Sequence, residues 1–473
     1  MKLSILSLIA MLFCTTIVHA QFNSFDLSKY KTADYSRRML DFSGFINGGY
    51  EENNKDSEDA HSHTTNIYPN LKLDYSSIQN TRKIQKQTFI NLEIKPNNYL
   101  STFNRQNKIT DPSQSKLTNN TYNAAFNFNS ENRLYFRRNM FFEINPVGFV
   151  DVSLQNYKSE NTSSNITTKF TEDKRTLYSN ISLPVRFGLG RLENVEDARM
   201  AIFILEDLQK NNQLAKAISD EDILAFATKI TQLRNKRHFD ARKRRIYEIQ
   251  ALDSFIRDNG FSGAQNAVYF SGIIDNWGYA NNPWRVSGNR FSIGMGPSLG
   301  YSINNHLSAE KNFSFNNGLG ISILGDFEKP INLKWQRSIR LETGYRIADV
   351  KNTREEKNSP TTKETLNNEW AYLNFNWGYG FYPDSRSYHV LSLNPNIQKE
   401  WVKPKNSTSN VSTDLVYNVT LWLNGYLYLS ERFNINYTLG LRYGGSNSEV
   451  MTETIKKNNF ATSFNLSCSY SIF

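Results

Sequence analysis

The feature that most constrains this chain is a strict alternation of apolar and polar residues over unusually long segments. Residues 290–302 read RFSIGMGPSLGYS, with Phe291, Ile293 and Met295 opening the apolar phase. Residues 432–444, RFNINYTLGLRYG, repeat the pattern, and so does the final segment, NFATSFNLSCSYSIF. Successive side chains of a strand point to opposite faces, so each segment predicts a strand with one apolar and one polar face.

The length of these segments favours a membrane-spanning sheet. Strands of soluble sheets are typically about 5–6 residues long, whereas a strand crossing a bilayer needs about 9–11 residues plus extensions. Lipid offers no partner for a sheet edge, so such a sheet must close into a barrel with an apolar outer face. The mean hydropathy of −0.57, combined with 13% aromatic residues, fits this alternation and argues against disorder.

We predict an all-β transmembrane antiparallel barrel of about 14 strands, in a range of about 12–16, with a helical periplasmic insertion. The predicted strands are 39–50, 65–76, 84–95, 120–129, 133–156, 176–190, 286–303, 311–325, 331–349, 367–381, 387–402, 414–429, 432–446 and 458–473. Long polar connections follow the odd-numbered strands, at 51–64, 96–119, 157–175, 350–366, 403–413 and 447–457. Tight connections follow the even-numbered strands, at 77–83, 130–132, 326–330, 382–386 and 430–431. Long outer loops and short periplasmic turns are typical of outer-membrane barrels, and the even count places both termini in the periplasm.

The N-terminal segment predicts export. Lys2 precedes an apolar run from Leu3 to Phe13, and small residues lead to Ala20. This is the layout of a signal peptide, residues 1–20, cut after Ala20, and the run is too short for a membrane-spanning helix. Export argues against a nucleic-acid partner. Residues 21–38 are expected to form a periplasmic segment or a plug of the barrel.

One connection after an even-numbered strand is long, and its pattern is helical. Residues 191–285 contain three amphipathic segments, the first beginning after the N-cap residue Asn194 and the second at Ser219. A third is expected from Asp240 to Asp258. This periplasmic insert separates barrel strands one to six, residues 39–190, from strands seven to fourteen, residues 286–473.

The chain resembles Gram-negative outer-membrane β-barrels of the Bacteroidota porin-like type. The resemblance rests on the signal ending at Ala20–Gln21, the long alternating strands and the terminal aromatic residue Phe473. Phe473 departs from the family pattern, because it shares the phase of Ser469 and Ser471 rather than that of the apolar residues. The resemblance implies location in the outer membrane, contact with its lipid, insertion by the barrel-assembly machinery and a role as a channel.

The charged residues of the polar phase are the candidate pore lining. The positive ones are Lys72, Lys95, Arg133, Arg137, Arg186, Arg290, Lys334, Arg340, Arg346, Arg432 and Arg442, and the negative ones are Asp41, Asp74, Glu93, Glu143 and Glu342. A pore lined mainly by one sign of charge selects the other sign. The excess of positive residues predicts a porin-like channel for small solutes with a preference for anions. The alternative is that these charges pair with one another.

The helical insert supports a second hypothesis, since a diffusion porin needs no such block. The barrel would then be an anchor, and the insert would dock a periplasmic protein or peptidoglycan. Residues 234–246, RNKRHFDARKRRI, supply a basic patch of Arg242, Lys243, Arg244 and Arg245 at the start of a helix, where positive charge is disfavoured.

Catalysis and metal binding are disfavoured by the sequence. The mature chain would keep five histidines, and none stands in a recognised nucleophile motif, so a barrel hydrolase is only a minor alternative. His61 and His63 lie in a polar segment that is more simply read as a solvated loop. Without its signal, the chain would retain a single cysteine, Cys468, and could form no intramolecular disulfide. We expect no cofactor and no metal.

Overall fold

The computed structural model describes most of the chain from Phe25 to Tyr470. The residues outside the description are 1–24, 56–59, 106–112, 138, 164–165, 237–240, 279–284, 307–309, 357–358, 406–411, 431–432, 451–452 and 471–473. The predicted signal peptide, Arg432 and Phe473 therefore lie outside the described residues.

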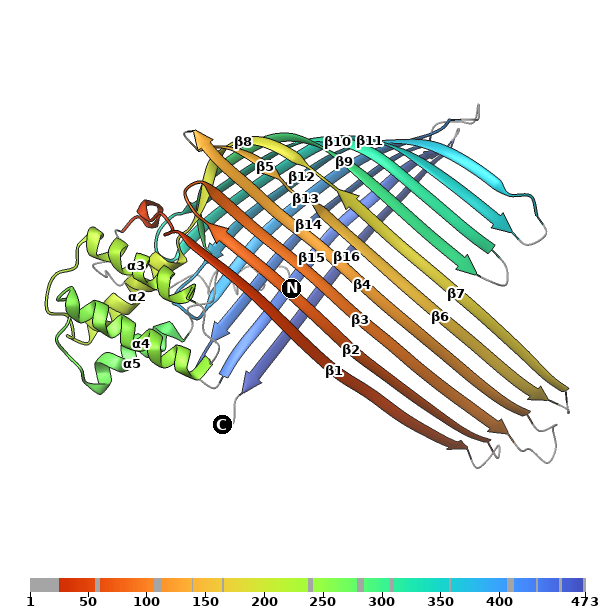
Figure 1. Ribbon diagram of the computed structural model, residues 1–473, viewed down its shortest axis with the longest axis horizontal. Coiled ribbons are helices and arrows are strands. Elements are labelled where there is room, and N and C mark those ends of the chain that lie inside the picture. Colours follow the sequence, from red (N-terminus) through yellow and green to blue (C-terminus); the bar gives the residue numbers. More distant parts are fainter. Residues whose placement is uncertain are drawn as a thin grey trace, which may run out of the picture.

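One antiparallel sheet of sixteen strands dominates the structure (Figure 1). Its strands are β1 (Tyr35–Lys55), β2 (Ala60–Asn80), β3 (Ile84–Arg105), β4 (Ser113–Arg137), β5 (Met140–Ile144), β6 (Val147–Ser163), β7 (Ile166–Ser182), β8 (Val185–Asn194), β9 (Val286–His306), β10 (Glu310–Pro330), β11 (Trp335–Glu356), β12 (Thr362–Phe381), β13 (Tyr388–Pro404), β14 (Ser412–Tyr428), β15 (Phe433–Val450) and β16 (Glu453–Tyr470). The described helices are η2 (Leu27–Lys29), α2 (Glu196–Lys210), α3 (Asp220–Arg234), α4 (Ala241–Asp258) and α5 (Ala267–Trp277).

The sixteen strands make fourteen passes, because two passes are interrupted. β5 continues into β6 after Asn145 and Pro146, and β7 continues into β8 after Leu183 and Pro184. Proline has no N–H for the ladder, so a break at these positions is expected. The two breaks lie side by side, since the Asn145 N–H donates to the Pro184 carbonyl at 2.9 Å. The predicted all-β antiparallel barrel of about 14 strands is confirmed.

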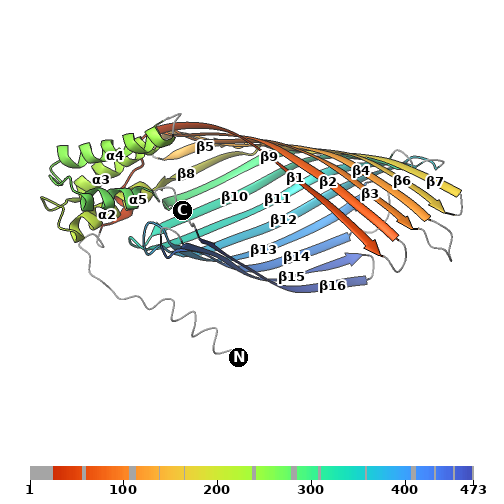
Figure 2. The ribbon, with the colours of Figure 1, turned by 90° about the horizontal axis from the view of Figure 1, so that it is seen from below.

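The sheet curls so that its apolar phase faces outward. Phe291, Ile293 and Met295 of β9 are 53–59% exposed, whereas Ser292 between them is buried. β1 and β16 are the end strands of the hydrogen-bonded order, and no ladder joins them within the described residues. The barrel is therefore open along one seam, and β1 and β16 lie apart on its two sides (Figure 2).

The predicted long loops are wrong, because most of those residues belong to strands. Residues 51–55 extend β1, residues 96–105 extend β3, and residues 113–119 begin β4. The ladder joins backbone groups, so a polar segment in water can continue a strand that needs no apolar face. The tight connections predicted at 130–132 and 326–330 also lie inside strands, β4 and β10 respectively.

The insert between β8 and β9 is helical, as predicted, and lies beyond the end of the sheet that carries the short turns (Figures 1 and 2). It contains α2, α3 and α4, and also a fourth helix, α5, that the sequence reading did not include. The N-cap of α3 forms as predicted, because the Ser219 side chain accepts from the Asp222 N–H in a capping box. Ile202, Phe226 and Leu252 belong to one fully buried core shared by these helices. None of the helices in the described part of the chain is long and apolar enough to cross a membrane.

The described part of the N-terminal segment packs into the helical insert rather than plugging the barrel. Phe25, Leu27 and Tyr30 are buried in the same core as the helices. The Tyr30 hydroxyl lies 2.6 Å from the Thr231 hydroxyl of α3, and Thr32 donates to the Asn194 carbonyl at 2.9 Å. Removing these side chains from water stabilises the packing of the segment against the helices.

Alkaline pH is expected to loosen this core. Burial raises the pKa of Tyr30 to about 12, above the value of about 10 for an exposed tyrosine. Between about pH 10 and 12 the unfolded chain loses a proton that the folded chain keeps, so stability falls as the pH rises. Arg285 acts in the opposite direction, because burial lowers its pKa to about 10. Tyr30→Phe should therefore flatten the loss of protease resistance of the insert between pH 9 and 12. An equally steep loss in this variant would contradict the assignment.

Candidate functional site

The inner wall of the barrel carries a cluster of eight charged residues near the short turns. Directly opposite residues on neighbouring strands share a face of the sheet. Arg133 of β4 lies opposite Glu143 of β5, and Glu143 lies opposite Arg186 of β8. Asp326 of β10 likewise lies opposite Arg290 of β9 and Arg340 of β11. We call Glu131, Arg133, Glu143, Arg186, Arg290, Asp326, Arg340 and Glu342 the charge network.

Salt bridges connect the members of this network. The Arg133 guanidinium bonds to Glu143 and lies 2.6 Å from Glu131. Arg186 reaches Glu143 at 3.2 Å and Glu342 at 3.9 Å, which links β8 to β11. Those are the contacts of one half of the network.

Asp326 organises the other half. Its carboxylate lies 2.6 Å from Arg290 and 3.6 Å from Arg340, and Arg340 in turn lies 3.9 Å from Glu342. The chain of contacts therefore runs from β4 to β11 without leaving the wall. Four arginines face four carboxylates, so the network carries no net charge.

The ion pairs are strongest where the charged side chains are most deeply buried. The side chain of Glu143 is 1% exposed, and those of Arg133 and Arg290 are each 9% exposed. A carboxylate withdrawn from water to this extent needs its partners, because an unpaired buried charge is costly. The exposed members, such as Arg340 with 52% of its side chain accessible, are more strongly screened by solvent.

Other predicted lining residues lie elsewhere on the wall or outside it. Lys72 pairs with Asp74 at 2.8 Å and Lys95 with Glu93 at 2.9 Å, and about half of each lysine side chain is accessible to solvent, 43% and 52% respectively. Arg346 bonds to the Ser298 hydroxyl, and its guanidinium lies 4.7 Å from the Trp370 ring centre.

Three further predicted lining residues also lie outside the charge network. Arg137 and Arg442 are exposed near other parts of the sheet. Placing Lys334 on a strand was wrong, because it belongs to the turn before β11 begins at Trp335. A proline at the end of β10 and the Asn332 side chain, which accepts from the Lys334 N–H at 2.9 Å, form that turn.

Two members of the network, Glu131 and Asp326, were not predicted as lining residues, because the sequence predicts tight turns at 130–132 and 326–330. Both residues stand instead in the polar phase of longer strands. Asp326, for example, shares a face of β10 with Leu324, which lies opposite Glu342 of β11. Continuing the alternation to the next turn residue is the sequence signal that includes them.

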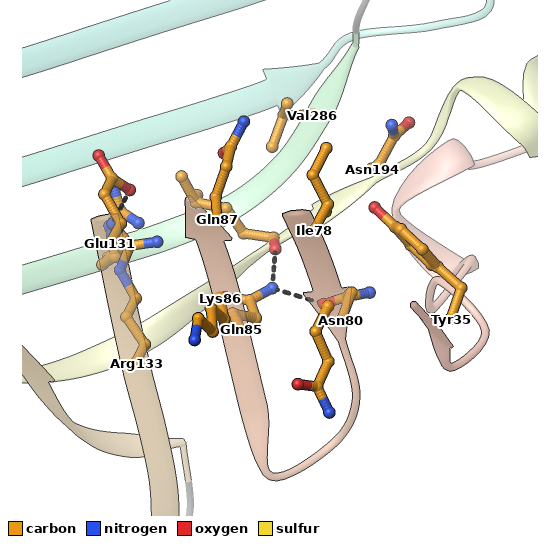
Figure 3. Close-up of a pocket in the computed structure, with 13 residues that line it drawn as sticks. Tyr35, Ile78, Asn80, Gln85, Lys86, Gln87, Glu131, Arg133, Asn194 and Val286 are labelled. Atoms are coloured by element: carbon orange, nitrogen blue, oxygen red, sulfur yellow. Dashed lines mark hydrogen bonds and ion pairs between the residues drawn. The ribbon is translucent and has the colours of Figure 1, made fainter. Parts of the chain in front are cut away.

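A cavity of about 210 Å³ opens beside the network (Figure 3). Glu131 and Arg133 form one side of it, and Tyr35 stands on the other. Between them, the Gln85 amide donates to the Asn80 side chain and to the Leu192 carbonyl, each at 3.0 Å.

A second part of the inner wall is lined by amides. Asn374 of β12, Asn396 of β13 and Asn418 of β14 lie opposite one another in a single row. Asn376 and Asn394 bond to each other in the next row. The five asparagines line a cavity of about 390 Å³ together with Thr420 and Trp422. We call these seven residues the amide wall.

Two buried arginines fix the helical insert to the short turns. Arg285 donates to the carbonyls of Asn332 and Trp335 at 2.9 and 2.8 Å, and also to that of Leu333. Arg199 of α2 donates to Glu196 at 2.7 Å and to the Asp384 carbonyl between β12 and β13. Both arginines are 0% exposed and connect the insert to the barrel. We call Arg199 and Arg285 the latch.

The predicted basic patch is only partly described. Arg244 pairs with Glu248 one turn later at 2.7 Å, which offsets its unfavourable place near a helix start. Arg245 is exposed, and the side chain of Arg242 lies outside the description. Within the described residues no three metal-ligating side chains gather. His63 instead contacts the Thr102 hydroxyl at 2.8 Å.

Comparison with known proteins supplies no family. No family model and no curated protein matches the chain. Among solved structures, the β domain of the Bordetella autotransporter BrkA aligns at 8% identity, with a TM-score of 0.22, over 93% of this chain and 100% of its own. The transport unit of the Escherichia coli autotransporter AIDA-I aligns at 8% identity, with a TM-score of 0.16, over 95% of each chain.

Proposed function

We propose that this protein is an outer-membrane channel of a Gram-negative bacterium for small, uncharged polar solutes. The observation that carries the proposal is the contrast between the two faces of one sheet. Ile293, Met295 and Leu299 point outward as a lipid-facing surface would, while the opposite face carries amides and paired charges. A polar lumen inside an apolar belt is the arrangement of a diffusion channel.

The charge network favours neutral solutes over the anions suggested by the sequence. Each of Arg133, Arg186, Arg290 and Arg340 has at least one carboxylate within 4 Å. Paired charges give only a weak field at the centre of a lumen, and selectivity by charge needs an excess of one sign.

Planar bilayers and liposomes test this proposal. The purified protein should conduct, with a reversal potential near zero in a KCl gradient. Liposomes containing it should swell faster with neutral sugars than with organic acids of the same size. A strong anion preference would restore the alternative suggested by the sequence, and a protein that inserts but passes nothing would refute the channel.

A second candidate is a docking role for the helical insert. Ile246 of α4 and Val268 and Ile274 of α5 are 39–54% exposed, although the insert already has a closed core. A photo-crosslinker at Ile246 should capture one defined periplasmic protein if the insert is a docking domain. The matched control is the polar, exposed Gln250 on the same helix. Equal yields at both sites would exclude specific docking.

A further inference from the structure

We infer that the amide wall is a binding site for a neutral saccharide on its way through the barrel. The inference rests on the proposed channel and names its substrate class. It is carried by three observations on β12, β13 and β14: the arrangement of the amides, the placement of one aromatic ring and the balance of charge.

The amides form a surface with regular spacing. Asn374, Asn396 and Asn418 stand on three successive strands, which lie about 4.8 Å apart. Each asparagine amide has two N–H donors and two acceptor lone pairs. The bond from Asn396 to Asn374 uses one donor of Asn396 and one lone pair of Asn374. Each amide keeps a donor and an acceptor for the lumen. Neighbouring hydroxyls of a sugar ring require alternating donors and acceptors of this kind.

Trp422 supplies an apolar platform beside the amides. It lies directly opposite Gly440 on β15, and a Cβ at Gly440 would collide with the indole ring. The missing side chain therefore lets the ring lie against the wall rather than project across the lumen. An aromatic face packs well against the C–H face of a pyranose, and binding sites commonly combine such a surface with a few convergent polar groups.

The charges at the edge of the site favour a neutral ligand. Arg340 and Glu342 both line the cavity, and their charged groups lie 3.9 Å apart. Each can make a charge-assisted hydrogen bond to a hydroxyl, and together they add no net charge. An anion or a cation would gain from one member of the pair and lose from the other.

The hydrogen-bonded ladder of the sheet is also interrupted at this point. The ladder between β12 and β13 runs to Asn374 and Asn396 and resumes at Trp377 and Leu393. Pro395 stands in the interval and has no N–H to donate. The cavity of about 390 Å³ lies at this interruption and falls in the usual range for small-molecule sites, about 300–1,000 Å³.

Binding of maltotriose to the purified full-length protein in detergent tests the inference. Calorimetry should detect saturable binding of maltotriose and none of sodium lactate. Trp422→Ala should weaken the affinity roughly tenfold, because stacking on an aromatic face contributes about 1.4 kcal/mol. The matched control is Trp377→Ala, which removes a tryptophan from β12 that lies outside the amide wall. The control should bind like the unaltered protein.

Conductance separates failure of the inference from failure of the channel. Maltotriose should block the current reversibly, and Trp422→Ala should shorten each block. Conductance without saccharide binding would overturn the inference and leave the channel proposal in place. Binding without conductance would overturn the channel alone. If Trp422→Ala does not fold, Trp422→Phe should fold and keep most of the affinity, whereas Asn396→Leu should lose it. Unchanged affinity in Asn396→Leu would also refute the site.

Discussion

Replacing Arg285 with Met is expected to release the helical insert from the barrel. The arginine is fully buried, and its donors satisfy the carbonyls of Asn332, Leu333 and Trp335. Methionine keeps much of the side-chain volume but donates nothing, so the carbonyls of Asn332 and Leu333 lose this donor. The Trp335 carbonyl keeps only the backbone N–H groups of its own turn. A buried acceptor left without a partner costs about 1–3 kcal/mol.

Limited proteolysis measures this release. The Met variant should be cut within residues 195–285 much faster than the unaltered protein, while the barrel remains resistant. Arg257→Met is the matched control, because Arg257 is exposed and its ion pair, at 3.1 Å, is with Asp253 of its own helix. Its effect should stay below about 1 kcal/mol. Equal protease resistance of all three proteins would show that the latch does not hold the insert.

Replacing Glu143 with Gln is expected to make the proposed channel selective for anions. Glu143 is the carboxylate shared by Arg133 and Arg186, and Gln keeps its shape while removing its charge. The wall then carries one uncompensated positive charge. For an ion about 8 Å away and an effective dielectric constant of about 40, one unit charge changes the energy of the ion by about 1 kcal/mol, which is roughly fivefold in permeability.

Reversal potentials in a KCl gradient measure this change, and a second variant controls it. Glu143→Gln combined with Arg186→Gln restores the balance of charge, so its potential should return toward zero. The same variants report on stability, because the single replacement leaves two arginines short of a buried partner and the double replacement leaves one. A single variant with the reversal potential of the unaltered protein would show that the network lies outside the ion path.

The β-barrel architecture could be predicted from particular residues. The alternation around Phe291 and Ile293 shows a two-faced strand directly, because side chains of a strand point to opposite faces at every step. The helical insert could be predicted as well. The hydrophobic period changes from that of a strand to that of a helix after Asn194, and Ser219 caps a helix through contacts with its own neighbours. Strand ends were not predictable, because the ladder of β1 and β2 continues through polar residues that carry no apolar pattern.

The sequence by itself determined the two faces of each strand, the order of the fourteen passes and the place of the helical insert, because all three are encoded by neighbouring residues. Only the tertiary structure decided which charges meet. Asp326 pairs with Arg290 and Arg340 because three strands align in one register, and a slip of one residue would reverse the face of each side chain. The same holds for the latch: the chain between Arg285 and Trp335 must run up and down the barrel before the two can touch. Contacts of this range depend on the whole sheet, so no local pattern records them.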